Sequence, residues 1–135
     1  MPTLFTRIID GDLPGRFVWS DDRVVAFLTI TPLTAGHTLV VPRAEVDDWT
    51  ALEPYLVAHL MTVSRTIGAA LKRAFGAPRA GVVIAGFEVP HAHVHVFPAW
   101  QMTDFDFSRV DPTVSAEDLD ANHKRLLDAL ANRDN

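Results

Sequence analysis

Hydrophobic and polar residues alternate along this chain with two different periods. From Pro54 to Phe75 the apolar positions lie three or four residues apart, which is the period of an amphipathic helix. A second stripe of this period begins at Ser115 and predicts a C-terminal helix. Apolar positions at near-helical spacing before Gly11 predict a short helical turn near the start. Thr50 and Glu53 resemble a capping box, so we expect helix initiation around them.

The remaining apolar runs are short and bounded by turn residues, so they predict β-strands. Asp21 and Asp22 separate the first two runs and predict a hairpin, and the short link before Pro90 predicts antiparallel pairing of the last two. The sequence therefore predicts an α+β fold, with an antiparallel sheet of about five strands, one long helix and a C-terminal helix. The predicted strands are Arg16–Ser20, Arg23–Thr29, His37–Val41, Arg79–Gly86 and the segment after Pro90.

Composition narrows the possible functions. The 135 residues fit one domain, and the net charge of −5 argues against broad non-specific binding to nucleic acid. The absence of cysteine excludes disulfides, thiolate catalysis and cysteine-ligated zinc. No apolar run approaches the roughly 18 residues of a membrane span, and no signal peptide is recognisable. We therefore expect a cytoplasmic protein without membrane or nucleic-acid partners.

Three of the six histidines stand at alternate positions, at His91, His93 and His95. Alternate residues of a β-strand share one face, so this spacing predicts a row of imidazoles. Ala92 and Val94 between them are small or β-branched and suit a packed face. The imidazoles are therefore expected on the opposite, accessible face of the strand.

Three interpretations of this row compete. An inert surface is one, although three adjacent imidazoles are an unusual choice for it. A metal site is another, because neutral imidazole ligates zinc well. However, His91 and His95 would lie about 13 Å apart along an extended strand at ~3.3 Å per residue. The third is attack on phosphorus, because an unprotonated imidazole nitrogen is a nucleophile near neutral pH when its other nitrogen donates its hydrogen elsewhere.

The residues around this row resemble the histidine triad (HIT) superfamily, in its Hint-like branch. The family signature, His-x-His-x-His followed by apolar residues, matches residues 91–97. The resemblance extends upstream to about residue 3 and includes a further histidine, His37. The other similar segments are 5–9, 21–27, 30–32, 36–42 and 101–102.

Membership implies a sheet that dimerises through the long helix and a strand edge, a nucleotide ligand, and attack on the α-phosphate. By resemblance His93 is the nucleophile, His91 supports its orientation and His95 contacts phosphate. His37 matches a histidine that packs behind the triad, and an ordinary core histidine is an equally weighted alternative. The resemblance implies no required cofactor, while the cluster could still take up adventitious zinc.

The resemblance also implies a nucleotide pocket. Its apolar base-binding surface matches Phe5, Ile8, Phe27 and Ile30, which by pattern alone would be core residues. Thr29 stands where the Hint pattern has an aspartate for the ribose hydroxyls, so we expect weaker ribose selectivity. Glu88 stands in place of a Ser or Thr that assists the leaving group, and it either donates a proton or repels phosphate.

The sequence thus predicts a HIT domain over residues 1–110, and residues 111–135 as a helical extension packed on it, without a counterpart in the family core. The expected function is hydrolysis of a nucleoside phosphoramidate or nucleotidyl ester through a nucleotidyl-His93 intermediate, with a purine nucleotide as ligand and a homodimer as assembly. His95 favours hydrolysis, because the transferase branch has glutamine there. The alternatives are a non-catalytic nucleotide-binding or regulatory protein of this family and, less favoured, a histidine-ligated metal-binding protein.

Overall fold

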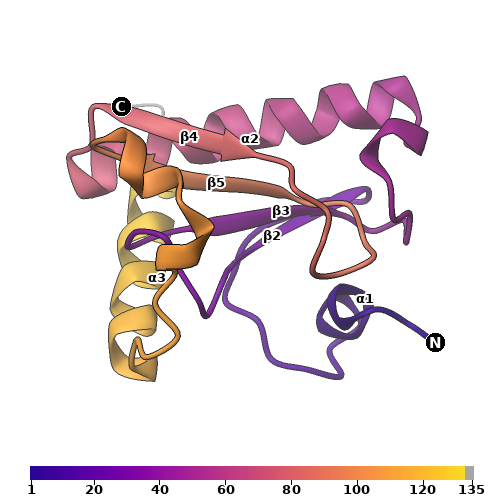
Figure 1. Cartoon of the computed structure of the whole chain (residues 1–135), viewed down its shortest axis with the longest axis horizontal. Helices are drawn as coiled ribbons and strands as arrows, with labels where there is room; N and C mark the ends of the chain where they lie inside the picture. Colours follow the sequence, from indigo (N-terminus) through magenta and orange to yellow (C-terminus); the bar gives the residue numbers. More distant parts are fainter. Residues whose placement is uncertain (133–135) are drawn as a thin grey trace.

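The computed structural model describes residues 1–132, which contain a five-stranded antiparallel sheet with the strand order β1-β2-β3-β5-β4 (Figure 1). The predicted α+β class, the β1–β2 hairpin and the antiparallel pairing of β4 with β5 are confirmed. The strands are β1 (Phe17–Ser20), β2 (Val24–Leu28), β3 (Thr38–Pro42), β4 (Arg79–Val83) and β5 (Val94–Ala99).

The helices lie close to their predicted positions. Ser115 caps α3, because its side chain accepts a hydrogen bond from the backbone N–H of Asp118. The predicted capping box at Thr50 and Glu53 is wrong: Thr50 lies in a separate 3₁₀ turn, and Glu53 makes no side-chain cap. Pro54 instead starts α2 with a preset φ angle. The elements are α1 (Leu4–Ile9), η1 (Trp49–Ala51), α2 (Pro54–Phe75), η2 (Met102–Phe105), η3 (Phe107–Arg109) and α3 (Ala116–Ala131).

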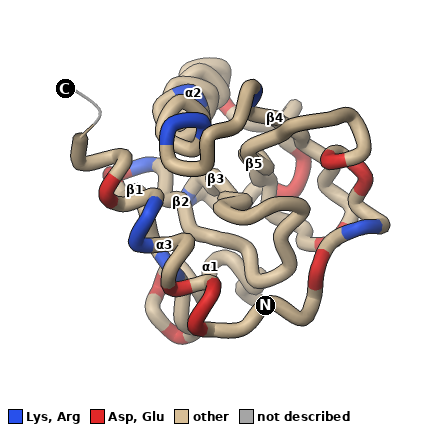
Figure 2. The backbone as a smooth tube through the Cα atoms, turned by 90° about the vertical axis from the view of Figure 1, so that its left-hand side faces the viewer, with Lys and Arg blue, Asp and Glu red and all other residues tan. Residues whose placement is uncertain are grey.

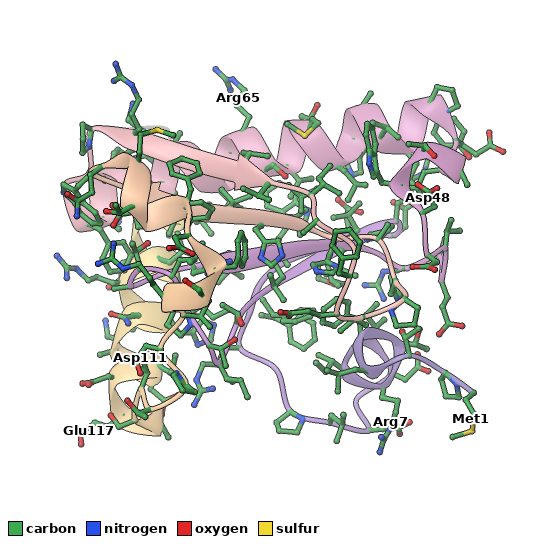
Figure 3. The ribbon with its side chains drawn as sticks, in the orientation of Figure 1. Met1, Arg7, Asp48, Arg65, Asp111 and Glu117 are labelled. Atoms are coloured by element: carbon green, nitrogen blue, oxygen red, sulfur yellow. The ribbon has the colours of Figure 1, made fainter. Side chains whose placement is uncertain are left out.

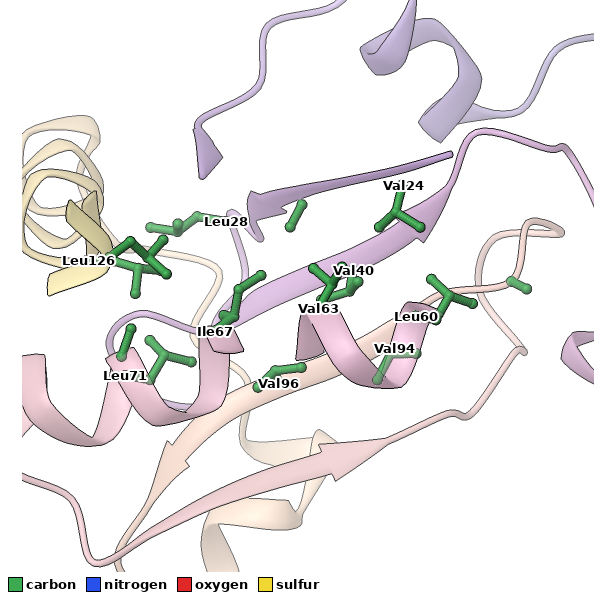
Figure 4. Close-up of a cluster of buried hydrophobic side chains, with 14 of the residues drawn as sticks. Val24, Leu28, Val40, Leu60, Val63, Ile67, Leu71, Val94, Val96 and Leu126 are labelled. Carbon is green, nitrogen blue, oxygen red and sulfur yellow. The ribbon is translucent and has the colours of Figure 1, made fainter. Parts of the chain in front are cut away.

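Alternate residues of the central strands enter two separate cores, as their period of two requires. One core lies between the sheet and α2 (Figure 4) and receives, among others, Val24, Ala26, Val40, Val94 and Val96. The other lies on the α1 side and contains Phe5, Val25, Phe27, Leu39 and Val41. Figure 1 shows α2 and α1 on opposite sides of the sheet. The sheet therefore has one face closed by α2, and a second face that the short α1, the turn η3 and loops cover.

The C-terminal helix α3 packs against α2 and β1. Its Leu126 and Leu130 are buried in the core on the α2 side. Leu127, which the sequence placed in the same apolar stripe, is 39% exposed and lies on the solvent side of the helix. The stripe is therefore narrower than predicted.

The last two strands are shorter than predicted, and this changes where the histidines lie. β4 ends at Val83 and β5 begins only at Val94, so residues 84–93 form a connecting loop. His91 and His93 belong to this loop, while His95 lies inside β5. The predicted continuous strand through all three histidines is therefore wrong at its beginning.

Gly36 sets the start of β3. It has a φ of +90°, and a Cβ there would lie 2.6 Å from an aromatic carbon of Phe75. Any other residue would be strained and would clash at this position. The glycine therefore lets the chain turn closely under α2 and deliver His37 to the opposite face of the sheet.

Charged side chains occupy the periphery. In Figure 2 acidic and basic positions are interspersed along α3 and the loops in view, while the charged positions of α2 are all basic. In Figure 3 the labelled Arg7, Arg65 and Glu117 point away from the body of the molecule. Among the described residues no helix combines the length and the apolarity needed to cross a bilayer.

Candidate active site

A cavity of about 650 Å³ lies on the sheet face opposite α2. Phe27 and Leu39 of the central strands line it, and α1 contributes Leu4, Phe5 and Ile8. The helix α1 therefore forms a wall of the cavity, and its Phe5 also belongs to the second core.

The cavity brings together nearly all residues that the sequence assigned to a nucleotide site. His91 is the exception, because its ring is fully buried behind the wall and does not line the cavity. The predicted residues that do line it are Phe5, Ile8, Phe27, Thr29, Ile30, His37, Glu88, His93 and His95.

The expectation of an accessible histidine row is wrong. His91, His93 and His95 are only 0%, 5% and 9% exposed. The ring of Phe5 packs edge-on against the rings of His91 and His93, at centroid distances of 5.8 and 4.8 Å. The helix that covers this face therefore excludes solvent from the imidazoles, while the cavity leaves part of them open to a ligand.

His93 is held in one tautomer by a backbone carbonyl. Its Nδ1 lies 2.7 Å from the carbonyl oxygen of His91, so Nδ1 carries the hydrogen and donates it. Nε2 of the neutral ring is then left with a free electron pair. Burial lowers the pKa of His93 below the usual 6.5, against the opposing effect of this hydrogen bond. The ring is therefore unprotonated at neutral pH.

A chain of hydrogen bonds sets the opposite tautomer at His95. The backbone N–H of Leu33 donates to Nδ1 of His37 over 2.9 Å, so the hydrogen of the His37 ring is on Nε2. This Nε2–H donates in turn to Nδ1 of His95, again over 2.9 Å. His95 must then carry its own hydrogen on Nε2. His37 is thus hydrogen-bonded on both nitrogens, as expected of a core histidine. It also lines the cavity behind His95, as the resemblance to the family implies.

Burial keeps this pair of rings neutral. Burial, with the neighbouring His95 and His93 rings, lowers the pKa of His37 to about 3. Burial and the His93 ring lower the pKa of His95 to about 4. At neutral pH the cavity wall therefore presents one acceptor nitrogen, on His93, beside one N–H donor, on His95, whose ring centroids lie 4.9 Å apart.

Several segments that the sequence did not assign to the site also reach the cavity, among them the loop of residues 13–16, η3 and α3. Phe107 of η3 lines it and packs edge-on against His95, with ring centroids 4.8 Å apart. Asp120 of α3 lines it as well, in an ion pair of 2.8 Å with Arg16. The aromatic and acidic composition after the triad was the available signal for Phe107, whereas Asp120 looked like any exposed helical acid.

The two residues that depart from the Hint pattern lie differently. Thr29 is half-buried, and its Oγ1 accepts a hydrogen bond of 3.2 Å from the backbone N–H of Thr31. Glu88 is exposed and lines the cavity from the loop before the triad. The hydroxyl of Thr29 thus already helps to hold a turn, while the Glu88 carboxylate is free to approach a ligand.

With the hydrogen bonds that it makes here, the histidine cluster is not preformed as a metal site. The bonds between His37 and His95, and from His93 to the His91 carbonyl, leave only the two Nε2 atoms of His93 and His95 directed at the cavity. Zinc sites use at least three protein ligands. Within residues 1–132 no group of three or more His, Asp or Glu side chains is arranged to hold an ion.

Comparison with known proteins gives the family. The HIT domain profile matches residues 10–102. An uncharacterised HIT-like protein of Borreliella burgdorferi is 37% identical over 113 residues, which are 78% of this chain and 81% of that protein.

Two solved structures extend the likeness to α3. A zinc-bound histidine triad family protein from Mycobacterium smegmatis superposes with a TM-score of 0.82 at 30% identity, over 97% of this chain and 94% of that one. A hypothetical histidine triad nucleotide-binding protein from Sulfolobus tokodaii gives a TM-score of 0.82 at 27% identity, over 95% and 91% of the chains. The C-terminal segment, which lies outside the family profile, therefore has counterparts in relatives. The chain belongs to the HIT family.

Proposed function

We propose that this chain binds a nucleotide in the cavity and hydrolyses a nucleoside phosphoramidate or nucleotidyl ester at the α-phosphate. The observation that carries the proposal is the pair of imidazoles in the cavity wall, where His93 offers an unprotonated Nε2 and His95 an Nε2–H. The Sulfolobus relative that carries nucleotide-binding in its name supports the choice of ligand. We also place the chain in the Hint-like branch, because Gln101 and Met102 follow the triad.

In the first step, Nε2 of His93 attacks the α-phosphorus. The bond from phosphorus to the leaving nitrogen or oxygen breaks, and the leaving group departs with the electron pair and takes up one proton. The nucleoside monophosphate is then bonded to His93 through a P–N bond. The His91 carbonyl accepts the Nδ1–H of His93, so it stabilises the positive charge that the ring gains. His95 donates its Nε2–H to a phosphate oxygen.

In the second step, water attacks the same phosphorus and gives up one proton. The P–N bond breaks, its electron pair returns to Nε2 of His93, and the nucleoside monophosphate leaves. Burial lowers the pKa of His93, so the released ring stays unprotonated and is ready for the next cycle. The neutral state of the imidazole therefore serves both the attack and the recovery of the enzyme.

The apolar part of the cavity suits a planar base. Phe5 and Phe27 line it with their rings, and Ile30 lies at its rim with 65% of its surface exposed. Such surfaces bind a base by burial and by stacking. A purine buries more area than a pyrimidine, so we propose a purine nucleotide as the ligand.

The test is turnover of adenosine and guanosine 5′-phosphoramidates, with an acid-free quench that traps nucleotidyl-protein. We expect turnover and a trapped adduct with the wild type, and loss of both with His93→Ala, while nucleotide affinity changes by less than about 10-fold. His59→Gln is the matched control, because His59 lies outside the cavity. An active His93→Ala variant would refute the role of His93. Nucleotide binding without turnover in the wild type would favour the non-catalytic alternative.

A further inference from the structure

We infer that Thr3, Thr6 and Glu45 form a hydrogen-bonded network that positions the nucleophile. The network holds the ring of His91 in place, and with it the carbonyl that orients His93. The inference rests on the proposed function of His93. None of these three residues lines the cavity. They would therefore act through His91 and not on the ligand.

This hydrogen-bonded network joins the N-terminus to the loop after β3. Oε1 of Glu45 accepts two hydrogen bonds of 2.7 Å, one from the backbone N–H of Thr3 and one from the hydroxyl of Thr6. The hydroxyl oxygen of Thr3 lies 2.7 Å from Nδ1 of His91. It also accepts a hydrogen bond of 3.1 Å from the backbone N–H of Thr6, which makes Thr3 the N-cap of α1. An exposed carboxylate is thus connected through hydroxyl groups to a buried imidazole.

The partner on the other side of the ring decides the direction of the central hydrogen bond. Nε2 of His91 lies 2.7 Å from the carbonyl oxygen of Pro42, which can only accept, so Nε2 carries the hydrogen. With its hydrogen on Nε2 the ring accepts at Nδ1, and the Thr3 hydroxyl donates to it over 2.7 Å. The hydroxyl oxygen of Thr6 lies 3.2 Å from that of Thr3 and is the weaker competitor for the same hydrogen. Thr6 donates its own hydroxyl hydrogen to Glu45. One threonine hydroxyl therefore caps a helix and fixes a tautomer at the same time.

Both nitrogens of His91 are occupied, and its ring is 0% exposed. Removing the Thr3 hydroxyl would leave a buried acceptor without a partner, which is costly and favours rotation of the ring. The carbonyl of the same residue lies 2.7 Å from Nδ1 of His93. A displaced His91 would therefore change the orientation of the His93 ring, whose Nε2 attacks phosphorus. A small misalignment of a reacting atom lowers the rate of the chemical step more than the affinity for substrate.

Two substitutions at Thr3 separate this role from helix capping. Serine and aspartate both cap helices well. Thr3→Ser keeps a hydroxyl that can donate to His91, whereas the carboxylate of Thr3→Asp cannot donate to a neutral Nδ1. A purely structural role would thus be preserved in both variants, but the positioning role only in the first. Thr6→Val is a second test, because it removes the hydrogen bond from the Thr6 hydroxyl to Glu45 and the 3.2 Å contact between the two hydroxyls, and leaves the contact of Thr3 with His91.

The experiment combines steady-state kinetics on a nucleoside phosphoramidate with ¹⁵N NMR of the imidazole nitrogens. We expect Thr3→Asp to lower kcat by about 10- to 100-fold with KM changed far less, and to abolish the His91 signal of a ring protonated at Nε2 only. Thr3→Ser should retain both, and Thr6→Val should lower kcat less. A Thr3→Asp variant with wild-type kcat and tautomer would overturn the inference. If the wild type shows no turnover, the proposed function fails. The NMR comparison still decides whether the hydrogen-bonded network sets the tautomer of His91.

Discussion

The four histidines of this site have three different hydrogen-bonding states, because only His37 and His91 both accept at Nδ1 and donate from Nε2. Backbone partners decide each of them: the Leu33 N–H for His37 and, through it, for His95, and a carbonyl for His91 and for His93. Solvent exclusion keeps the rings that contact the cavity neutral, since burial is the largest cause of each lowered pKa. A donor and an acceptor can therefore stand side by side without an external base.

Thr29 gives a prediction about sugar selectivity. Its hydroxyl is partly committed to the Thr31 backbone, and it offers no charge to the ribose hydroxyls. We expect kcat/KM for ribose and 2′-deoxyribose substrates to lie within about 10-fold of each other in the wild type. Thr29→Asp should increase the preference for ribose, because a carboxylate accepts two hydroxyl hydrogens. Strong ribose selectivity of the wild type would refute this assignment.

Glu88 gives a prediction about the leaving group. Burial lowers the pKa of His93 overall, and the negative charge of Glu88 acts against that shift, so the two groups interact. If Glu88 also passes a proton to the leaving group, Glu88→Gln should lower the turnover rate of substrates with poor leaving groups about 10-fold more than that of substrates with good ones. The measurement is the slope of log kcat against leaving-group pKa. An unchanged slope would mean that Glu88 only repels phosphate.

Among the elements, α3 contributes stability through one narrow stripe. Leu126 is fully buried, while the adjacent Leu127 is 39% exposed. We expect Leu126→Ala to lower the free energy of unfolding by about 2–4 kcal/mol, and Leu127→Ala to lower it by less than about 0.5 kcal/mol. Urea denaturation of the two variants measures the difference. Equal losses would show that α3 does not pack as described, and this would also question Asp120 as a wall of the cavity.

For the whole molecule, the buried histidines predict acid sensitivity. The pKa of His37 lies near 3 and that of His95 near 4, against about 6.5 in an unfolded chain. Below pH 6.5 the unfolded state therefore binds more protons, and the stability present above this pH is lost as the pH falls towards 4. We expect the free energy of unfolding to fall by up to about 1.4 kcal/mol per pH unit for each such histidine.

Urea titrations at several values between pH 7.5 and pH 4.5 measure this dependence. His37→Gln should reduce the slope by about one proton. Carboxyl groups of the unfolded chain titrate mostly below about pH 4.5, so they contribute little in this window. A stability that is constant between pH 7 and pH 5 would contradict the burial of neutral imidazoles.

The edge of the sheet gives a prediction about assembly. β4 is an edge strand, and Val82 on it and Met61 on α2 are 41% and 42% exposed. Exposed apolar groups beside an unpaired strand edge favour pairing with a second copy. We expect light scattering to give about twice the 14.9 kDa mass of the chain, and Val82→Lys to shift the protein towards monomer. A monomeric wild type at micromolar concentration would exclude this dimer.

The sequence by itself determined the order and type of the elements α1–α3 and β1–β5, and the side of β5 on which His95 and Phe97 lie. Backbone geometry imposes periods of 3.6 and 2, and hydrophobic residues at those spacings record it locally. The residues before Val94 were misread, because burial of His91 and His93 depends on α1 folding over them. The tertiary structure alone decided which ring nitrogen carries each hydrogen, and brought Phe107 and Asp120 to the cavity. The physical reason is that hydrogen-bond partners and solvent exclusion come from segments far apart in the chain, and residue spacing carries no record of them.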